Sequence, residues 1–164
     1  MIAVLQRVTS ASVRVAGSEI ARIGPGALVL VGAVREDGPA DVKILASRLL
    51  RLRVFADEQD RMNRSLLDTG GEILLVSQFT LAADTRKGRR PSFDRALSPD
   101  IAEPLLESLA ARLREGGAAV QTGEFGARME VELVNDGPVT MLLDSRLTRR
   151  GGRRDPSIGE SEHA

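Results

Sequence analysis

Three hydrogen-bonding side chains stand at the end of an apolar run. Residues 72–76 form a continuous, partly β-branched run that follows Gly70-Gly71, which is typical of a strand buried on both faces. Ser77, Gln78 and Thr80 come directly after it, around Phe79. Such groups could bind a polar ligand, or they could only satisfy free backbone groups at a strand end. The segment 77–80 is therefore a candidate site wall, with both interpretations open.

The residues that the chain lacks restrict its chemistry. It has no cysteine, and its only histidine, His163, lies next to the C-terminus. A Ser-His or Cys-His pair, or a metal held by histidine, would need the C-terminal segment to fold back. Any reaction would therefore depend on threonine, serine, carboxylates, backbone groups or the substrate. We assign no cofactor and no metal site, although oxygen ligands could still hold a magnesium ion.

Basic residues are concentrated in two places, although the net charge is zero. Four of the five residues at 86–90 are Arg or Lys, and five arginines crowd the region 146–154. Local basic patches on a neutral protein indicate a partner whose phosphates touch one side. The alternative is a solvated loop and a charged solubility tail. With four Phe and no Trp or Tyr, the chain has few platforms on which single-stranded bases could stack.

Hydrophobic patterns predict the elements that must position these residues. They predict an α+β protein with a mostly antiparallel sheet, or partly closed barrel, and two amphipathic helices. The helices are expected at 41–53 and 100–114, the second opened by a capping box from Asp100 to Glu103. Strands are expected at 1–8, 10–15, 18–23 and 27–34 as an antiparallel meander, and at 72–76, 118–121, 129–134 and 139–143. The segment 57–69 reads as irregular, and Asn135-Asp136-Gly137 as a tight turn.

Length and composition predict one domain at 1–147 and a basic, polar tail at 148–164. The tail has too few apolar residues to pack, so we expect it to be disordered. The sequence has no N-terminal leader pattern and no apolar run of membrane-spanning length. We therefore expect a soluble, cytoplasmic protein with no membrane partner.

Five motifs together resemble the D-aminoacyl-tRNA deacylase family. They are QRV at 6–8, SQFTL at 77–81, KGRRPSF at 87–93, FGARMEVELV at 125–134 and NDGPVT at 135–140. Each is short, but all five occur in the expected order and spacing between Met1 and about Arg146. The tail after Arg146 lies outside the resemblance.

The resemblance implies a homodimeric hydrolase that removes D-amino acids, and glycine, from the 3′ end of aminoacyl-tRNA. It implies that a cis Gly137-Pro138 dipeptide enters the partner subunit's pocket and that Arg7 holds it. Ser77, Gln78, Phe79 and Thr80 would form the catalytic wall of that pocket. The substrate-binding residues would be Phe125 near the terminal adenine, Met129, Lys87, Arg89 and Arg90. Ala82 departs from the aromatic residue that is frequent at this place in the family.

Residue chemistry points to a mechanism without a protein base. A threonine nucleophile needs a base within reach, and the sequence offers none beside Thr80. The aminoacyl ester carries a vicinal 2′-hydroxyl that can assist proton transfer, so the protein would need only to orient the ester. We expect the backbone N–H groups of Phe79 and Thr80 to stabilise the oxyanion. The alternatives are covalent catalysis by Thr80, a Thr-dependent hydrolase of small esters or peptides, and a non-catalytic RNA-binding module.

Overall fold

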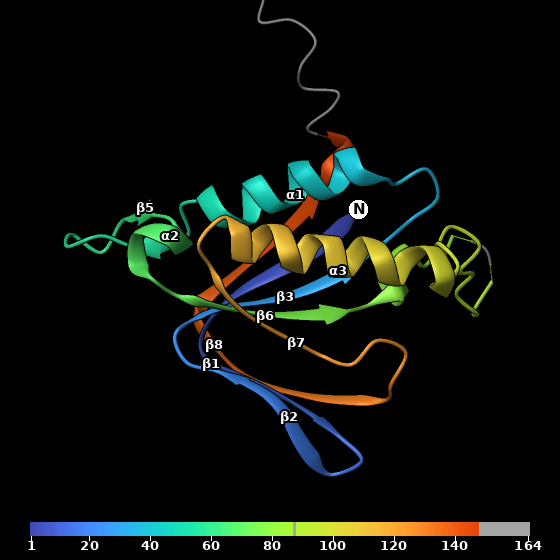
Figure 1. Cartoon of the computed structure of the whole chain (residues 1–164), viewed down its shortest axis with the longest axis horizontal. Helices are drawn as coiled ribbons and strands as arrows, with labels where there is room; N and C mark the ends of the chain where they lie inside the picture. Colours follow the sequence, from blue (N-terminus) through green and yellow to red (C-terminus); the bar gives the residue numbers. More distant parts are fainter. Residues whose placement is uncertain (87, 148–164) are drawn as a thin grey trace, which may run out of the picture.

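The predicted α+β class is confirmed: a mixed, mostly antiparallel sheet curls toward a barrel and carries its long helices on one face (Figure 1). The computed structural model describes residues 1–86 and 88–147. The strands are β1 (Ile2–Val15), β2 (Ser18–Ile23), β3 (Gly26–Gly32), β4 (Phe55–Ala56), β5 (Met62–Arg64), β6 (Glu72–Ser77), β7 (Ala119–Thr122) and β8 (Met129–Asp144). The helices are α1 (Pro39–Arg51), α2 (Leu66–Thr69), α3 (Pro99–Glu115) and the 3-10 turn η1 (Phe79–Ala82).

The sheet is organised around β1, which is one strand and not the two predicted at 1–8 and 10–15. One edge of β1 pairs antiparallel with β8 from Ile2 to Val15. On the other edge, β3 pairs antiparallel with residues 2–8 of β1 and β2 pairs antiparallel with residues 11–15, with a register shift between Val13 and Arg14. The predicted meander is therefore wrong, because β2 and β3 share one partner. Local patterns predict strands but not the edge on which each one pairs.

Two parallel connections place the helices over the sheet. β6 pairs in parallel with β3, and β7 pairs in parallel with β6. The chain crosses through α1 before β6 and through α3 before β7, and the two helices lie side by side on the same face of the sheet (Figure 1). β6 is buried on both faces, as predicted. Ile73 and Leu75 pack toward the helices, while Leu74 and Val76 pack inside the curl of the sheet.

The segment 57–69 is ordered by polar contacts, and its prediction as irregular is wrong. β4 and β5 form a hairpin around Asp57, whose carboxylate accepts hydrogen bonds from the Gln59 and Arg61 N–H groups and from Asn63 Nδ2. The hydrogen bond from Asn63 is the largest cause that lowers the pKa of Asp57 below its ordinary value. Hydrophobic periodicity gives no signal for structure of this kind.

The two long helices begin slightly earlier than predicted. α1 begins at Pro39, and α3 begins at Pro99 after Ser98, whose side chain makes no capping bond. The capping box predicted from Asp100 is therefore wrong. Pro99 explains the earlier start of α3, because proline fits the first helical position, where its missing N–H costs nothing.

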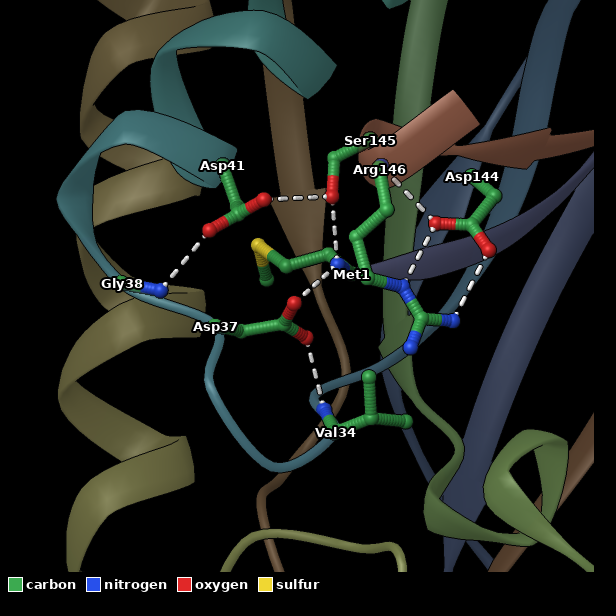
Figure 2. A network of polar contacts seen from close by, with 8 residues as sticks. All are labelled: Met1, Val34, Asp37, Gly38, Asp41, Asp144, Ser145 and Arg146. Atoms are coloured by element: carbon green, nitrogen blue, oxygen red, sulfur yellow. Dashed lines mark hydrogen bonds and ion pairs between the residues drawn. The ribbon is translucent and has the colours of Figure 1, made fainter. Parts of the chain in front are cut away.

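A buried polar network joins the beginning of β1, the end of β8 and α1 (Figure 2). The Met1 ammonium group donates to Asp37 Oδ1 and to Ser145 Oγ, each at 2.6 Å, and Ser145 Oγ donates to Asp41 Oδ1 at 2.8 Å. Asp37 and Asp41 also accept the backbone N–H groups of Val34 and Gly38. The network joins the ends of the paired strands β1 and β8 to the beginning of α1. None of the described helices is both long and apolar enough to cross a membrane.

Candidate active site

The candidate site begins where β6 ends. Ser77 is the last residue of β6 and pairs with Val31, and the Gln78 N–H donates to the Val31 carbonyl at 2.7 Å. The chain then turns through η1, which packs closely against Gly32. A Cβ atom at Gly32 would lie 2.8 Å from the Gln78 carbonyl oxygen, so only glycine fits there without a shift of the turn. The sequence analysis missed Gly32, because nothing in the sequence shows this close approach.

Two backbone N–H groups remain free at the start of η1. The N–H groups of Leu81 and Ala83 donate to the carbonyls of Gln78 and Thr80. No hydrogen bond from the N–H groups of Phe79 or Thr80 to a backbone acceptor occurs among the described residues. These two groups are therefore available to an oxygen atom of a ligand.

The Thr80 hydroxyl has no hydrogen-bonded base among the described residues. Its Oγ1 accepts a hydrogen bond from Gln78 Nε2 at 2.5 Å, and the residue is exposed. No carboxylate or lysine hydrogen-bonds to this hydroxyl within the part of the chain that the structure describes. The Gln78 amide donates a hydrogen bond to Thr80, and an amide is too weak a base to remove the proton of the hydroxyl.

A cavity of about 460 Å³ opens beside the turn. Five of the residues predicted for the site line it: Ser77, Gln78, Phe79, Phe125 and Met129. Its remaining walls come from the ends of β3 and β6, from the segments 96–97 and 126–127, from the beginning of α3 and from Val131 of β8. The Phe79 side chain is 58% exposed, and its ring meets that of Phe93 edge-to-face at 5.0 Å. The cavity is therefore apolar on most of its walls, with polar groups gathered at the end of β6.

Gly137 and Pro138 form a bulge within β8 and not the tight turn between two strands that was predicted. The residues on both sides of it pair with β1, with Asn135 opposite Val8 and Thr140 opposite Gln6. Asn135 Nδ2 fastens the bulge by donating to the carbonyls of Arg7 and Val139. The Gly137-Pro138 peptide bond is cis, and both residues are exposed.

Arg7 lies under this bulge. Its side chain is 13% exposed, its Nη1 donates to the Val54 carbonyl at 2.7 Å, and its Nε lies 2.9 Å from Asp136 Oδ2 in an ion pair. Gly137 has a φ of 118°, and a Cβ atom there would lie 3.0 Å from Arg7 Nη2. The backbone therefore favours glycine here, and a side chain would also press on Val139, whose Cγ2 would lie 2.8 Å from the added Cβ atom.

One chain does not bring all the predicted site residues together. Neither Arg7, Gly137 nor Pro138 is among the described residues that line the cavity, and Thr80 lies beside it. The predicted site therefore consists of two halves on this chain: the cavity with the turn η1, and the bulge with Arg7.

The basic loop after the site contains one neutralised and two free arginines. Arg86 pairs with Asp84 in the same loop, and the hydrogen bond from Arg86 holds the pKa of the Asp84 carboxyl well below its ordinary value. Arg89 and Arg90 are exposed and have no ion-pair partner in the described residues. Lys87 and the tail 148–164 lie outside the described residues. Within the described part, no group of three or more Asp, Glu, His or Cys side chains could hold a metal ion.

Comparison with known proteins gives consistent matches along the chain. A family model described as D-Tyr-tRNA(Tyr) deacylase matches residues 4–144. The D-aminoacyl-tRNA deacylase of Roseiflexus sp. (strain RS-1) is 57% identical over 149 residues, which cover 91% of this chain and 96% of the relative. That of Bacillus velezensis is 54% identical, with 87% of this chain and 97% of the relative covered.

Two solved structures share the fold. One is described as "c-Myc DNA Unwinding Element Binding Protein" and matches with a TM-score of 0.84 and 42% identity over 88% of this chain and 98% of the other. The second is described as a probable eukaryotic D-amino acid tRNA deacylase, with a TM-score of 0.75 over 87% of this chain and 97% of the other. At 21% identity, the second supports the fold alone.

Proposed function

Because the chain belongs to the D-Tyr-tRNA(Tyr) deacylase family, we propose that it hydrolyses the ester bond between a D-amino acid and the 3′ end of tRNA and spares L-aminoacyl esters. Deacylation of D-aminoacyl-tRNA is a proofreading reaction of translation, and the enzyme is an ester hydrolase. The observation that carries the proposal is the family match over residues 4–144, which includes both halves of the predicted site.

The ester lies in the cavity with its carbonyl oxygen toward η1. Water adds to the carbonyl carbon, and the free N–H groups of Phe79 and Thr80 stabilise the negative charge that develops on the carbonyl oxygen. The vicinal 2′-hydroxyl of the terminal ribose relays a proton from the attacking water to the leaving 3′-oxygen. The products are free amino acid and tRNA with an intact 3′ end. This mechanism requires orientation by the protein but no protein base.

The structure offers less support to covalent catalysis by Thr80. A threonine nucleophile requires a group that accepts its proton, and the hydrogen-bonding neighbour of Thr80 is the Gln78 amide, which donates. Thr80 therefore contributes a backbone N–H group and a positioned hydroxyl.

The functional enzyme is a homodimer in which Gly137 and Pro138 enter the partner's cavity. Both residues are exposed in the single chain, outside the cavity whose chemistry they would complete. An apolar surface on the paired strands β1 and β8 supports the assembly: Leu142 is 72% exposed and lies opposite the half-buried Val4. A contact with a second copy of the chain would bury this leucine.

Arg89 and Arg90 contact the phosphates of the tRNA. Among the described residues of the loop beside η1, they are the cations without an ion-pair partner, and phosphate contacts add affinity without acting at the ester.

A second candidate function is nucleic-acid binding without turnover. It is favoured by the free arginines and by the likeness to a structure that is described as a DNA-binding protein. It gives no role to the free N–H groups of η1 or to the apolar cavity, so we rank it second.

A deacylation assay with matched substrates tests the proposal. The purified protein should hydrolyse D-Tyr-tRNA and Gly-tRNA, and it should leave L-Tyr-tRNA and L-Ala-tRNA intact. Glycine should react because it has no side chain to exclude. Binding of all four tRNAs with no hydrolysis would favour the second candidate, and cleavage of L-Ala-tRNA would contradict selection by chirality.

A further inference from the structure

A second cavity of about 240 Å³ adjoins the main one, between α3 and the ends of β6 and β7. We call it the side cavity. Ser77, Leu106 and Phe125 line both cavities, so the two have a common wall. Adjacent cavities with a common wall can hold consecutive units of one extended ligand. The proposed function leaves the side cavity unused.

The side cavity combines an apolar floor with a charged rim. Leu75 and Ala110 are buried beneath it, and Glu103, Glu107 and Arg114 of α3 stand around it. The two glutamates are one helical turn apart, and neither has a hydrogen-bond or ion-pair partner within residues 1–86 and 88–147. Arg114 Nη2 donates to the Val120 carbonyl at 3.1 Å, which holds the guanidinium group at the rim.

Carboxylates without a partner weaken RNA binding, because the phosphates of the RNA repel them. A carboxylate gains from such a position when it accepts a hydrogen bond from the exocyclic amine of a base, as Glu and Asp do with the N4 amine of cytosine. The base that precedes the terminal adenosine in tRNA is a cytosine.

We propose that the side cavity binds this penultimate cytosine, with Glu103 and Glu107 accepting hydrogen bonds from its N4 amine. The proposal rests on the proposed function, because the aminoacylated adenosine must occupy the main cavity. Phe125 is half-buried in the common wall, where a base can stack against its ring. Arg114 offsets the charge of the glutamates and can reach a phosphate of the same strand end.

The test compares D-Tyr-tRNA with its normal end and D-Tyr-tRNA in which the penultimate cytosine is replaced by uracil. Uracil has a carbonyl oxygen in place of the N4 amine, so it presents an acceptor to the two carboxylates. The wild-type protein should show a KM about tenfold higher for the uracil substrate. The double variant Glu103→Gln/Glu107→Gln should lose this difference, because glutamine both donates and accepts.

Glu115→Gln is the matched control, since Glu115 is an exposed glutamate of α3 that does not line the side cavity. This variant should keep the tenfold preference. A merely structural role of Glu103 and Glu107 would change the KM of both substrates by the same factor and leave their ratio intact, which would overturn the proposal. Equal KM values for the two substrates in the wild-type protein would also overturn it.

Binding measurements separate this inference from the proposed function. A fluorescent RNA oligonucleotide ending in CCA should bind the wild-type protein about tenfold more tightly than one ending in CUA. This readout needs no hydrolysis, so it tests the side cavity separately from the deacylase activity. Hydrolysis of D-Tyr-tRNA together with equal binding of the two oligonucleotides would reject the side-cavity assignment and leave the deacylase assignment standing.

Discussion

Thr80 has different roles in the substrate-assisted mechanism and in covalent catalysis, so it separates the two. Its hydroxyl accepts a hydrogen bond from Gln78, and within residues 1–86 and 88–147 no base hydrogen-bonds to it. We predict that Thr80→Ala lowers kcat by about tenfold or less, because the N–H group of residue 80 stays in place. The measurement is single-turnover hydrolysis of D-Tyr-tRNA. An inactive Thr80→Ala variant, rescued by Thr80→Ser, would indicate a threonine nucleophile.

Arg89 and Arg90 provide a test of how the tRNA is held. Replacing both by alanine should raise KM and reduce the salt dependence of binding, with kcat nearly unchanged, because phosphate contacts do not act at the ester. Arg86→Ala is the matched control, since Asp84 already neutralises Arg86 and its loss should have little effect. If kcat of the double variant fell by the same factor by which KM rose, these arginines would lie at the reacting centre instead.

Single residues differ in how far the sequence could reveal them. Ser77, Gln78, Phe79, Phe125 and Met129 were identified from motifs, and the structure places all five around one cavity. Gly32 was missed, because its importance comes from the approach of a turn 46 residues later in the chain. The free N–H groups of Phe79 and Thr80 were expected at a strand end, but their freedom depends on the 3-10 turn, which the sequence did not predict.

The turn η1 orients the backbone N–H groups of Phe79 and Thr80. Gly32 allows this turn to lie close to β3. We predict that Gly32→Ala lowers kcat by about tenfold or more, because the added methyl group would push on the Gln78 carbonyl and move η1. The fold should survive, since the change is at the end of β3. Circular dichroism and single-turnover kinetics together check this.

Gly38→Ala serves as the control for the Gly32 variant, because the space around Gly38 is open. Wild-type kcat in Gly32→Ala would show that the position of η1 does not limit the reaction.

Elements were predictable where their signal was local. The buried strand at 72–77 and the two long helices follow from hydrophobic runs and periodicity, and their bounds differ from the prediction by a few residues. The bulge at Gly137 and Pro138 could not be distinguished from a hairpin turn, because both use the same residues. In a hairpin the two arms would pair with each other, whereas here the residues on both sides of the bulge pair with the same strand, β1.

At the scale of the whole molecule, we propose that the two halves of the site come from two subunits. Gly137 and Pro138 lie outside the cavity of their own chain, while the cavity ends at the exposed Phe79. We predict that each of two variants inactivates the homodimer. Gly137→Trp prevents the bulge from entering the partner's cavity, and Thr80→Tyr blocks the turn η1.

Mixing these two variants should restore activity, because a mixed dimer contains one cavity in which the turn and the entering bulge are both intact. The expected recovery is about a quarter of the wild-type rate, since half of the dimers are mixed and each has one working site. Mixed dimers that form but remain inactive would indicate self-contained sites.

The central claim is that the protein cleaves the ester by orientation and backbone hydrogen bonds, while the substrate supplies the hydroxyl that moves the proton. The most direct test is single-turnover hydrolysis of D-Tyr-tRNA that ends in adenosine or in 2′-deoxyadenosine, with the amino acid on the 3′-oxygen of both. The account predicts similar binding and a fall in rate of about a hundredfold or more for the deoxy substrate. Equal rates for the two substrates would contradict it and would require a proton acceptor from the protein.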